Sequence, residues 1–300
     1  MTYASIVHLI GDTPLIELSS FSPRPGVRIY AKLEGTNPGG SIKDRIALFM
    51  LQQAMASGVL ASSRHIIEAT SGNTGIALAM LCSIMGFHFT AVMPDNASQE
   101  RRSLLQAYGA SLVLTDGSKG TNYSIQVARD LVQKSNGKAI SLDQFNNTAN
   151  PMAHFNGTGQ EILHDCPEIT HFIAGIGTGG TISGVGKRLK KRNPDIKVYG
   201  VEPGESVSVE GLRNLREYSP AVLDLSVLDE KLILPSSQSA IQLAQELFQK
   251  EGLSVGISSG AALWGALEVA RELDKARMVI IFPDRGDKYY STELFRFESY

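Results

Sequence analysis

The sequence is poor in the residues that mark several large classes of protein. Its 300 residues include only 2 cysteines and 1 tryptophan. No stretch reaches the roughly 18 consecutive apolar residues that a membrane-spanning helix needs. The two cysteines, Cys82 and Cys166, cannot form a framework of disulfide bridges, and they lack the close spacing of metal ligands. We therefore expect a reduced, cytoplasmic setting and no metal site.

Neither sign of charge is in excess. Lysine and arginine total 28 and aspartate and glutamate total 30, which gives a formal net charge of −2. A chain without a basic surplus is not expected to bind nucleic acid or an anionic membrane. The first residues also lack the basic segment and long apolar core of a signal peptide. Hydrophobic residues make up 43%, so a chain of this length can bury a sizeable core.

Short apolar runs alternate with helical patterns along the chain. Strands are expected at residues 65–69, 87–93, 111–115, 171–176, 198–201 and 278–282, and helices at 76–85, 98–108, 182–191, 239–250 and 261–270. This alternation predicts an α/β fold with mostly parallel sheets covered by helices. Ligands bind such sheets at the carboxyl ends of the strands. The loops that follow strands therefore become the candidate functional segments.

One loop, residues 35–45, ends in Ser41-Ile42-Lys43-Asp44-Arg45. Ser41 can cap a helix whose first turn holds Lys43 and Asp44. Taken alone, the loop is more typical of one that carries a solvated surface lysine at position 43. Alternatively, the positive helix end and partial burial lower its pKa, and the free amine can then attack an aldehyde to form a Schiff base.

Three further loops join strands to helices or begin helices. Residues 70–75 (T-S-G-N-T-G) combine backbone N–H groups with hydroxyl and amide side chains, which suits a carboxylate. Residues 177–181 (G-T-G-G-T) contain no lysine or arginine, so a phosphate there would rely on N–H groups, hydroxyls and the helix dipole. Residues 256–260 (G-I-S-S-G) precede an apolar helix. Each loop alone is also typical of a plain capped turn.

Together, the order and spacing of these four loops resemble the cysteine synthases, a family of fold-type II pyridoxal-phosphate enzymes. The resemblance covers nearly the whole chain, from G-D-T-P-L at residues 11–15 to D-R-G at 284–286. It implies a tryptophan synthase β-like fold of two α/β domains, with pyridoxal 5'-phosphate in the cleft between them. The smaller domain is expected at residues 35–149 and the larger at 1–34 and 150–300. The family also implies a homodimer.

The resemblance assigns roles to individual residues. Lys43 holds the cofactor and moves the substrate's α-proton, Asn73 bonds the ring hydroxyl, and Ser258 meets the pyridine nitrogen. A neutral serine at that nitrogen favours β-elimination and replacement over transamination. The phosphate-binding residues implied are Gly177, Thr178, Gly179, Gly180 and Thr181. The positions that match the family's substrate-carboxylate site are Thr70, Ser71, Thr74 and Gln144.

The implied reaction replaces the acetate of O-acetyl-L-serine, through an aminoacrylate intermediate, with sulfide or thiosulfate to give L-cysteine or S-sulfocysteine. Residues 93–96 (M-P-D-N) and 98–102 (S-Q-E-R-R) resemble the B isozyme. So does Arg213, at a position where that isozyme carries an arginine linked to larger sulfur donors. The pair Gly179-Gly180 instead matches the A isozyme.

Other interpretations remain open at this point. The chain also fits another β-replacing enzyme of the same fold, such as a cystathionine β-synthase-like enzyme or a serine sulfhydrylase. A nucleotide-binding Rossmann protein would need a G-x-G-x-x-G loop after an early strand, which we do not find. A binding protein that has lost the chemistry would not be expected to keep Lys43, Asn73 and Ser258. Arg213 has a simpler alternative as an exposed surface arginine.

Overall fold

The computed structural model describes residues 2–60, 65–70, 72–216 and 219–297, and within these residues the strands form two sheets. The larger sheet has six strands in the order β1-β2-β10-β7-β8-β9. Only β1 runs antiparallel to its neighbour, so this sheet is mostly parallel. Its strands are β1 (Leu15–Glu17), β2 (Val27–Leu33), β7 (His171–Gly175), β8 (Lys197–Pro203), β9 (Glu230–Leu234) and β10 (Ala276–Phe282).

The smaller sheet has four parallel strands in the order β5-β4-β3-β6. Its strands are β3 (His65–Ala69), β4 (His88–Pro94), β5 (Ser111–Thr115) and β6 (Ala139–Ile140). The helices that accompany the two sheets are α1 (Lys43–Ala56), α2 (Asn73–Met85), α3 (Gln99–Ala107), α4 (Gly120–Lys134), α5 (Ala149–Ala153), α6 (Gly159–Asp165), α7 (Gly180–Arg192), α8 (Ser237–Glu251) and α9 (Ile257–Ala270). A π-helix, His154–Thr158, joins α5 to α6.

Strand β10 shows how the larger sheet is covered on both faces. Met278, Ile280 and Phe282 belong to the core beneath α8 and α9. Val279 and Ile281 belong to the core beneath α6 and α7. This alternation follows from the two-residue period of a strand, and it makes the sheet the middle of three layers.

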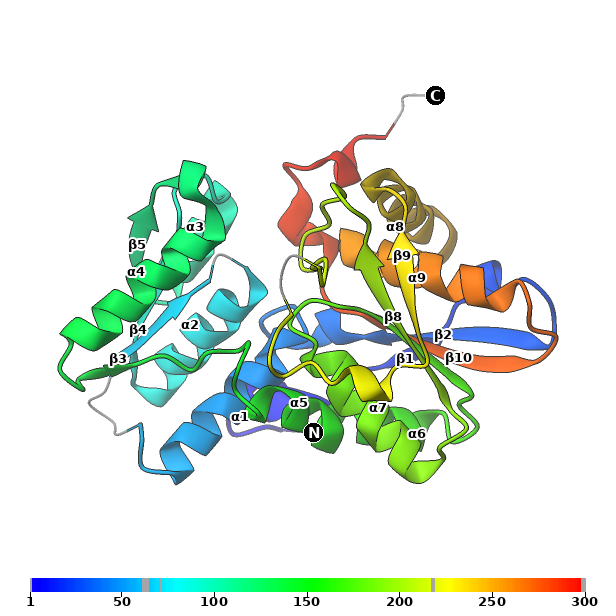
Figure 1. Ribbon diagram of the computed structural model, residues 1–300, viewed down its shortest axis with the longest axis horizontal. Coiled ribbons are helices and arrows are strands. Elements are labelled where there is room, and N and C mark those ends of the chain that lie inside the picture. Colours follow the sequence, from blue (N-terminus) through cyan, green and yellow to red (C-terminus); the bar gives the residue numbers. More distant parts are fainter. Residues whose placement is uncertain (1, 61–64, 71, 217–218, 298–300) are drawn as a thin grey trace.

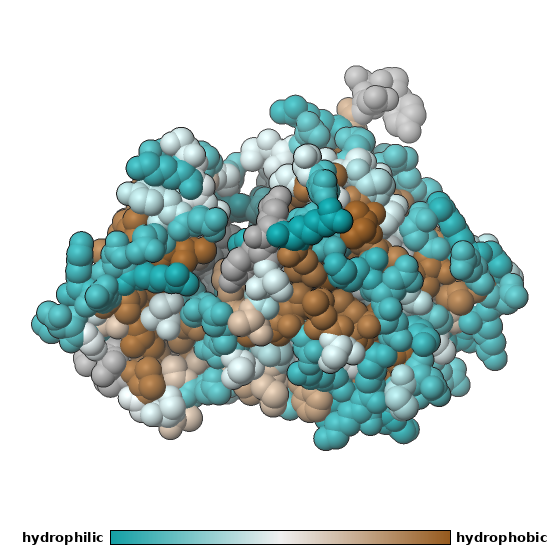
Figure 2. All heavy atoms as spheres, in the orientation of Figure 1, coloured by the Kyte–Doolittle hydropathy of each residue, from teal (hydrophilic) through white to brown (hydrophobic). Residues whose placement is uncertain are grey.

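The smaller sheet is also covered on both faces, by α1–α3 on one and α4 on the other. We call this sheet with α2–α4 the four-stranded lobe, and the larger sheet with α6–α9 the six-stranded lobe. The two lobes stand side by side in Figure 1, with α1 and α5 near the junction between them. The surface is indented between the lobes (Figure 2). The exact division into domains at residues 35 and 149 stays a prediction.

Several helices begin earlier than the apolar periodicity indicated. The helices expected at 76, 182 and 261 begin at Asn73, Gly180 and Ile257. The polar and glycine residues of the preceding loops form the first helical turn, and they carry no apolar signal that would reveal it. The expected cap of α1 is also shifted, because Ile42 occupies the cap position while Ser41 Oγ accepts a 3.2 Å hydrogen bond from Lys43 N. Among the described helices, none has the length and apolar character needed to span a membrane.

Candidate active site

A cavity of about 620 Å³ opens where the loops after the strands of both sheets meet. Residues at or just beyond the carboxyl ends of β3, β7, β8 and β10 line it, as expected for a ligand site in parallel sheets. Its volume falls in the range of about 300–1,000 Å³ typical of small-molecule sites. The site residues expected from the sequence that line it are Lys43, Thr70, Asn73, Thr74, Gln144, Gly177, Thr178, Gly179, Thr181, Arg213 and Ser258. Gly180 begins α7 directly beside this lining, and Ser71 lies outside the described residues.

Lys43 is the first residue of α1, and its side chain is partly buried at the cavity wall. Burial lowers the pKa of Lys43, and the nearby positive charge of Lys288 lowers it further. The carboxylates of Asp284 and Glu34 oppose this effect without reversing it. The amine of Lys43 is therefore neutral more often than that of a surface lysine, as a nucleophile or base requires.

The loop at residues 177–181 leads into the N-terminus of α7. Gly179 occupies the cap position with φ of +83°, a conformation that favours glycine. A Cβ on Gly177 would lie 2.3 Å from the carbonyl oxygen of Gly211, so this position also needs glycine. Thr178 Oγ1 accepts hydrogen bonds from Asn150 Nδ2 at 3.0 Å and from Gly180 N at 3.3 Å. The result is a hydrogen-bonded helix N-terminus at the cavity lining, which suits an anion.

Thr70 and residues 72–74 also line the cavity. Thr70 Oγ1 accepts a hydrogen bond from Gly75 N at 3.0 Å. Thr74 Oγ1 donates to Gln144 Oε1 at 2.7 Å. The structure thus brings Thr70, Thr74 and Gln144 to one wall of the cavity. Hydroxyl and amide groups in this arrangement can bind a carboxylate.

Glu68 is a buried carboxylate of β3 that sequence reasoning missed. Its Oε2 accepts hydrogen bonds from Ser141 Oγ at 2.8 Å, Leu142 N at 2.9 Å and Asp143 N at 3.2 Å. It therefore fixes the segment that carries Gln144. An acidic residue inside an apolar strand was the signal that could have revealed it, because buried carboxylates require such partners.

Asn73 begins α2 and is held between two charged side chains. Its Nδ2 donates to Asp284 Oδ2 at 2.7 Å, and its Oδ1 accepts from Lys288 Nζ at 2.7 Å. Tyr289 also donates its hydroxyl to Asp284 Oδ2 at 2.7 Å. Sequence reasoning missed Asp284, Lys288 and Tyr289. Asp284 could have been found, because it follows β10 at the carboxyl edge of the sheet.

Asp284 is only 2% exposed, and its second oxygen, Oδ1, has no hydrogen-bond partner in the described part of the chain. Burial raises the pKa of Asp284, and the charge of Lys288 with the hydrogen bonds from Asn73 and Tyr289 opposes that rise. Ser258, in the first turn of α9, is 4% exposed and also lines the cavity. Because buried polar atoms are normally hydrogen-bonded, a polar ligand in the cavity would supply partners for such groups.

Arg213 lies in the segment after β8 and contributes to the cavity lining. Its backbone N–H donates to Ile176 O at 2.9 Å. Its guanidinium carbon lies 4.7 Å from the centroid of the Phe145 ring, a cation–π contact. Phe145 directly follows Gln144, and both line the cavity, so Arg213 lies beside this part of the lining.

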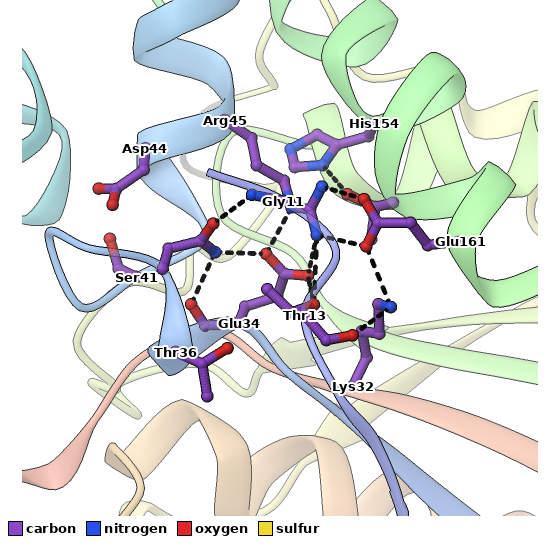
Figure 3. A network of polar contacts seen from close by, with 12 residues as sticks. Gly11, Thr13, Lys32, Glu34, Thr36, Ser41, Asp44, Arg45, His154 and Glu161 are labelled. Atoms are coloured by element: carbon purple, nitrogen blue, oxygen red, sulfur yellow. Dashed lines mark hydrogen bonds and ion pairs between the residues drawn. The ribbon is translucent and has the colours of Figure 1, made fainter. Parts of the chain in front are cut away.

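A network of buried charges anchors the helix that carries Lys43 (Figure 3). Arg45 donates to both oxygens of Glu34, at 2.6 and 2.8 Å, and to both oxygens of Glu161, at 2.6 and 2.7 Å. Glu161 also pairs at 3.0 Å with Lys32, whose side chain is fully buried. Bidentate pairs between an arginine and a carboxylate fix the relative orientation of the two side chains and also stabilise their charges. The first turn of α1 is therefore held against the turn that follows β2 and against α6, while the rest of α1 belongs to the core of the smaller sheet.

Comparison with known proteins identifies similar sequences and structures. The family model described as pyridoxal-phosphate dependent enzyme matches residues 6–284. The cysteine synthase of Aquifex aeolicus is 46% identical over 97% of this chain and 92% of its own length. Cysteine synthase B of Salmonella typhimurium is 43% identical over 95% of this chain and 94% of its own. The crystal structure of O-ureido-L-serine synthase superposes with a TM-score of 0.94 at 37% identity, covering 100% of this chain and 98% of that one.

Proposed function

Because this chain belongs to the family of pyridoxal-phosphate dependent enzymes, we propose that it is a cysteine synthase. It would convert O-acetyl-L-serine and sulfide into L-cysteine and acetate. One observation carries this proposal. Lys43, whose amine has a lowered pKa, lines a single cavity together with the N-terminus of α7, where residues 177–181 include no cation, and with the hydroxyl residues Thr70 and Thr74. The relatives named cysteine synthase support the choice of reaction.

The residues around the cavity fit pyridoxal phosphate. The N-terminus of α7, with Thr178 and Thr181, suits the phosphate, because N–H groups and hydroxyls there face the cavity without a competing cation in the loop. Lys43 supplies the amine that would hold the cofactor through its aldehyde. Asn73 and Ser258 supply a donor amide and a hydroxyl for the ring's oxygen and nitrogen. Once bound, the cofactor supplies an electron sink for the substrate's α-carbon.

The chain's own residues would bind and orient the amino acid and move its proton. Thr70, Thr74 and Gln144 bind the carboxylate of the substrate, and the resemblance adds Ser71. The Lys43 amine, once free, takes the α-proton and later returns it. A lowered pKa helps both steps, because the amine accepts the proton only in its neutral form and releases it more readily.

The sulfur donor is a separate question. Sulfide is small and needs little recognition, whereas thiosulfate is a dianion and needs a positive partner. We assign that partner as Arg213, because its guanidinium lies beside Phe145 at the cavity lining. On this basis thiosulfate is a second donor and S-sulfocysteine its product.

The setting of the enzyme follows from the family resemblance. We infer a homodimer that works in the cytoplasm, with the smaller domain at residues 35–149. The cytoplasmic setting is supported by the two cysteines, Cys82 and Cys166, which are buried and free. Size measurement by light scattering tests the dimer.

A product assay tests the proposed reaction. The purified chain, supplied with pyridoxal phosphate, should form cysteine from O-acetyl-L-serine and sulfide, and the Lys43→Ala variant should not. The same preparation is then given L-serine in place of O-acetyl-L-serine. Cysteine formed from serine alone, with O-acetyl-L-serine left unused, would favour the serine sulfhydrylase or cystathionine β-synthase-like alternative.

A further inference from the structure

Lys288, a residue that the sequence motifs do not include, connects two segments of the proposed cofactor site. Its Nζ lies 2.7 Å from Asn73 Oδ1, 3.0 Å from Gly39 O and 3.2 Å from Gly40 O. An ammonium has three N–H donors and no acceptor. These three oxygens therefore account for its full hydrogen-bonding capacity. The side chain is partly buried, so water competes little for the same donors.

The contact with Lys288 determines how the amide of Asn73 is oriented. The amide oxygen faces the ammonium, and the amide nitrogen faces the carboxylate of Asp284 at 2.7 Å. An amide oxygen only accepts hydrogen bonds and an amide nitrogen only donates them. Rotating the amide by 180° would therefore lose both bonds, and it would place the amide nitrogen against the ammonium of Lys288 and the amide oxygen against the carboxylate of Asp284. One N–H of Asn73 is used by Asp284. Because Asn73 lines the cavity, the second N–H is the donor that a ligand there would meet.

The other two contacts of Lys288 hold the loop that leads to Lys43. Gly39 and Gly40 precede Ser41, whose hydroxyl accepts from the backbone N–H of Lys43. Gly40 has φ of +77°, and its N–H donates to Asn37 O at 2.7 Å. A single ammonium thus links the approach to α1 with the first residue of α2. Both helices begin at residues of the proposed cofactor site.

We propose that Lys288 is a positioning residue for the cofactor. It holds Asn73 in the one orientation that offers an N–H group to the ring hydroxyl of pyridoxal phosphate, and it steadies the loop before Lys43. This inference rests on the proposed function, because it requires that cofactor in the cavity. Lys288 does not itself take part in the chemistry.

A double-mutant cycle on cofactor affinity tests the proposal. The dissociation constant of pyridoxal phosphate is measured by fluorescence titration of the cofactor-free protein. The four proteins are wild type, Lys288→Met, Asn73→Ala and the double variant. Lys288→Met should weaken binding by about tenfold or more when Asn73 is present, the size expected for losing a charge-assisted contact. In the Asn73→Ala background the same change should cost less than about threefold.

Matched variants separate this role from general effects of charge and folding. Lys288→Arg keeps the positive charge and N–H donors, and it should recover most of the lost affinity. Lys275→Met removes an exposed lysine and should bind the cofactor as wild type does. Thermal melting checks that each variant is folded, and Lys288→Gln replaces Lys288→Met if the latter does not fold.

Three results are decisive. A wild-type chain that does not bind pyridoxal phosphate overturns the proposed function itself. If wild type binds and the Lys288 variant binds equally well, Lys288 has no positioning role. An equal loss in the presence and absence of Asn73 also overturns the proposal, because Lys288 would then act by another route.

Discussion

Thr74 Oγ1 donates a 2.7 Å hydrogen bond to Gln144 Oε1, joining the first turn of α2 to the segment after β6. Both side chains are buried, at 4% and 7% exposure. Glu68 holds the same segment by accepting hydrogen bonds from the N–H groups of Leu142 and Asp143. Two of the groups proposed to bind the substrate carboxylate are therefore fixed relative to each other in the free protein. Such preorganisation lowers the conformational entropy that these side chains lose when the substrate binds.

Replacing Gln144 tests this arrangement. Gln144→Ala should raise KM for O-acetyl-L-serine or slow the release of acetate, because a hydrogen bond to a carboxylate contributes about 1.5–3 kcal/mol. That free energy corresponds to roughly a tenfold to hundredfold change. Gln249→Ala, at an exposed position of α8, is the control. Unchanged rates and KM in Gln144→Ala would remove this residue from the substrate site.

Arg213 allows a prediction about the sulfur donor. Arg213→Ala should depress the reaction with thiosulfate and leave the reaction with sulfide largely intact, because only the dianion needs a cation. Arg216 in the same segment is exposed and pairs with Glu205, so Arg216→Ala is the matched control. Equal losses with both donors would indicate a structural role for Arg213. No loss with either donor would show that it takes no part in donor recognition.

The buried network around Arg45 predicts a pH dependence of stability. Burial alone would raise the pKa of Glu161, but the hydrogen bonds and charge of Arg45, with the charge of Lys32, lower it to about 2 from an ordinary value of 4.5. A carboxyl with a lowered folded-state pKa stabilises the fold above its unfolded pKa. That stabilisation, on the order of 3 kcal/mol, should be lost as the pH falls from about 4.5 to about 2.

Urea unfolding at a series of pH values measures this effect. Glu161→Gln should lower the free energy of unfolding at pH 7 by about 3 kcal/mol or more. It should also flatten the dependence on pH between 4.5 and 2. Glu268→Gln, which breaks an exposed pair with Arg271, should change stability by less than about 1 kcal/mol. A Glu161→Gln variant with the wild-type pH dependence would contradict this account of the network.

The sequence allowed much of the fold and the main loops of the site to be predicted. The strands at residues 65–69 and 111–115 were placed to the residue, because each is a short run bounded by turn residues. The starts of α2 and α7 were placed too late, because Asn73 and Gly180 carry no apolar signal. The π-helix at His154–Thr158 was not expected, since its wider turn has no clear signature in the local sequence.

Residues that act through distant partners could not be predicted from local patterns. Lys288 and Asn73 are 215 positions apart in the chain, yet their side chains are in direct contact. Asn150 is similar, because its Nδ2 joins Thr178 to the carbonyl of Gln144. Nothing in the few residues around either one identifies such a partner. Only the folded arrangement of the two lobes brings these groups together.

The attachment of the cofactor to Lys43 is the central claim, and peptide mapping tests it most directly. The purified protein, loaded with pyridoxal phosphate, is reduced with borohydride so that any Schiff base becomes a stable bond. It is then digested with trypsin and measured by mass spectrometry. We predict the added mass of the cofactor on Lys43, with Lys288 unmodified, and no visible cofactor absorption band of the Schiff-base type in Lys43→Ala. Cofactor mass on Lys288 or another lysine, or a normal band in Lys43→Ala, would contradict the account.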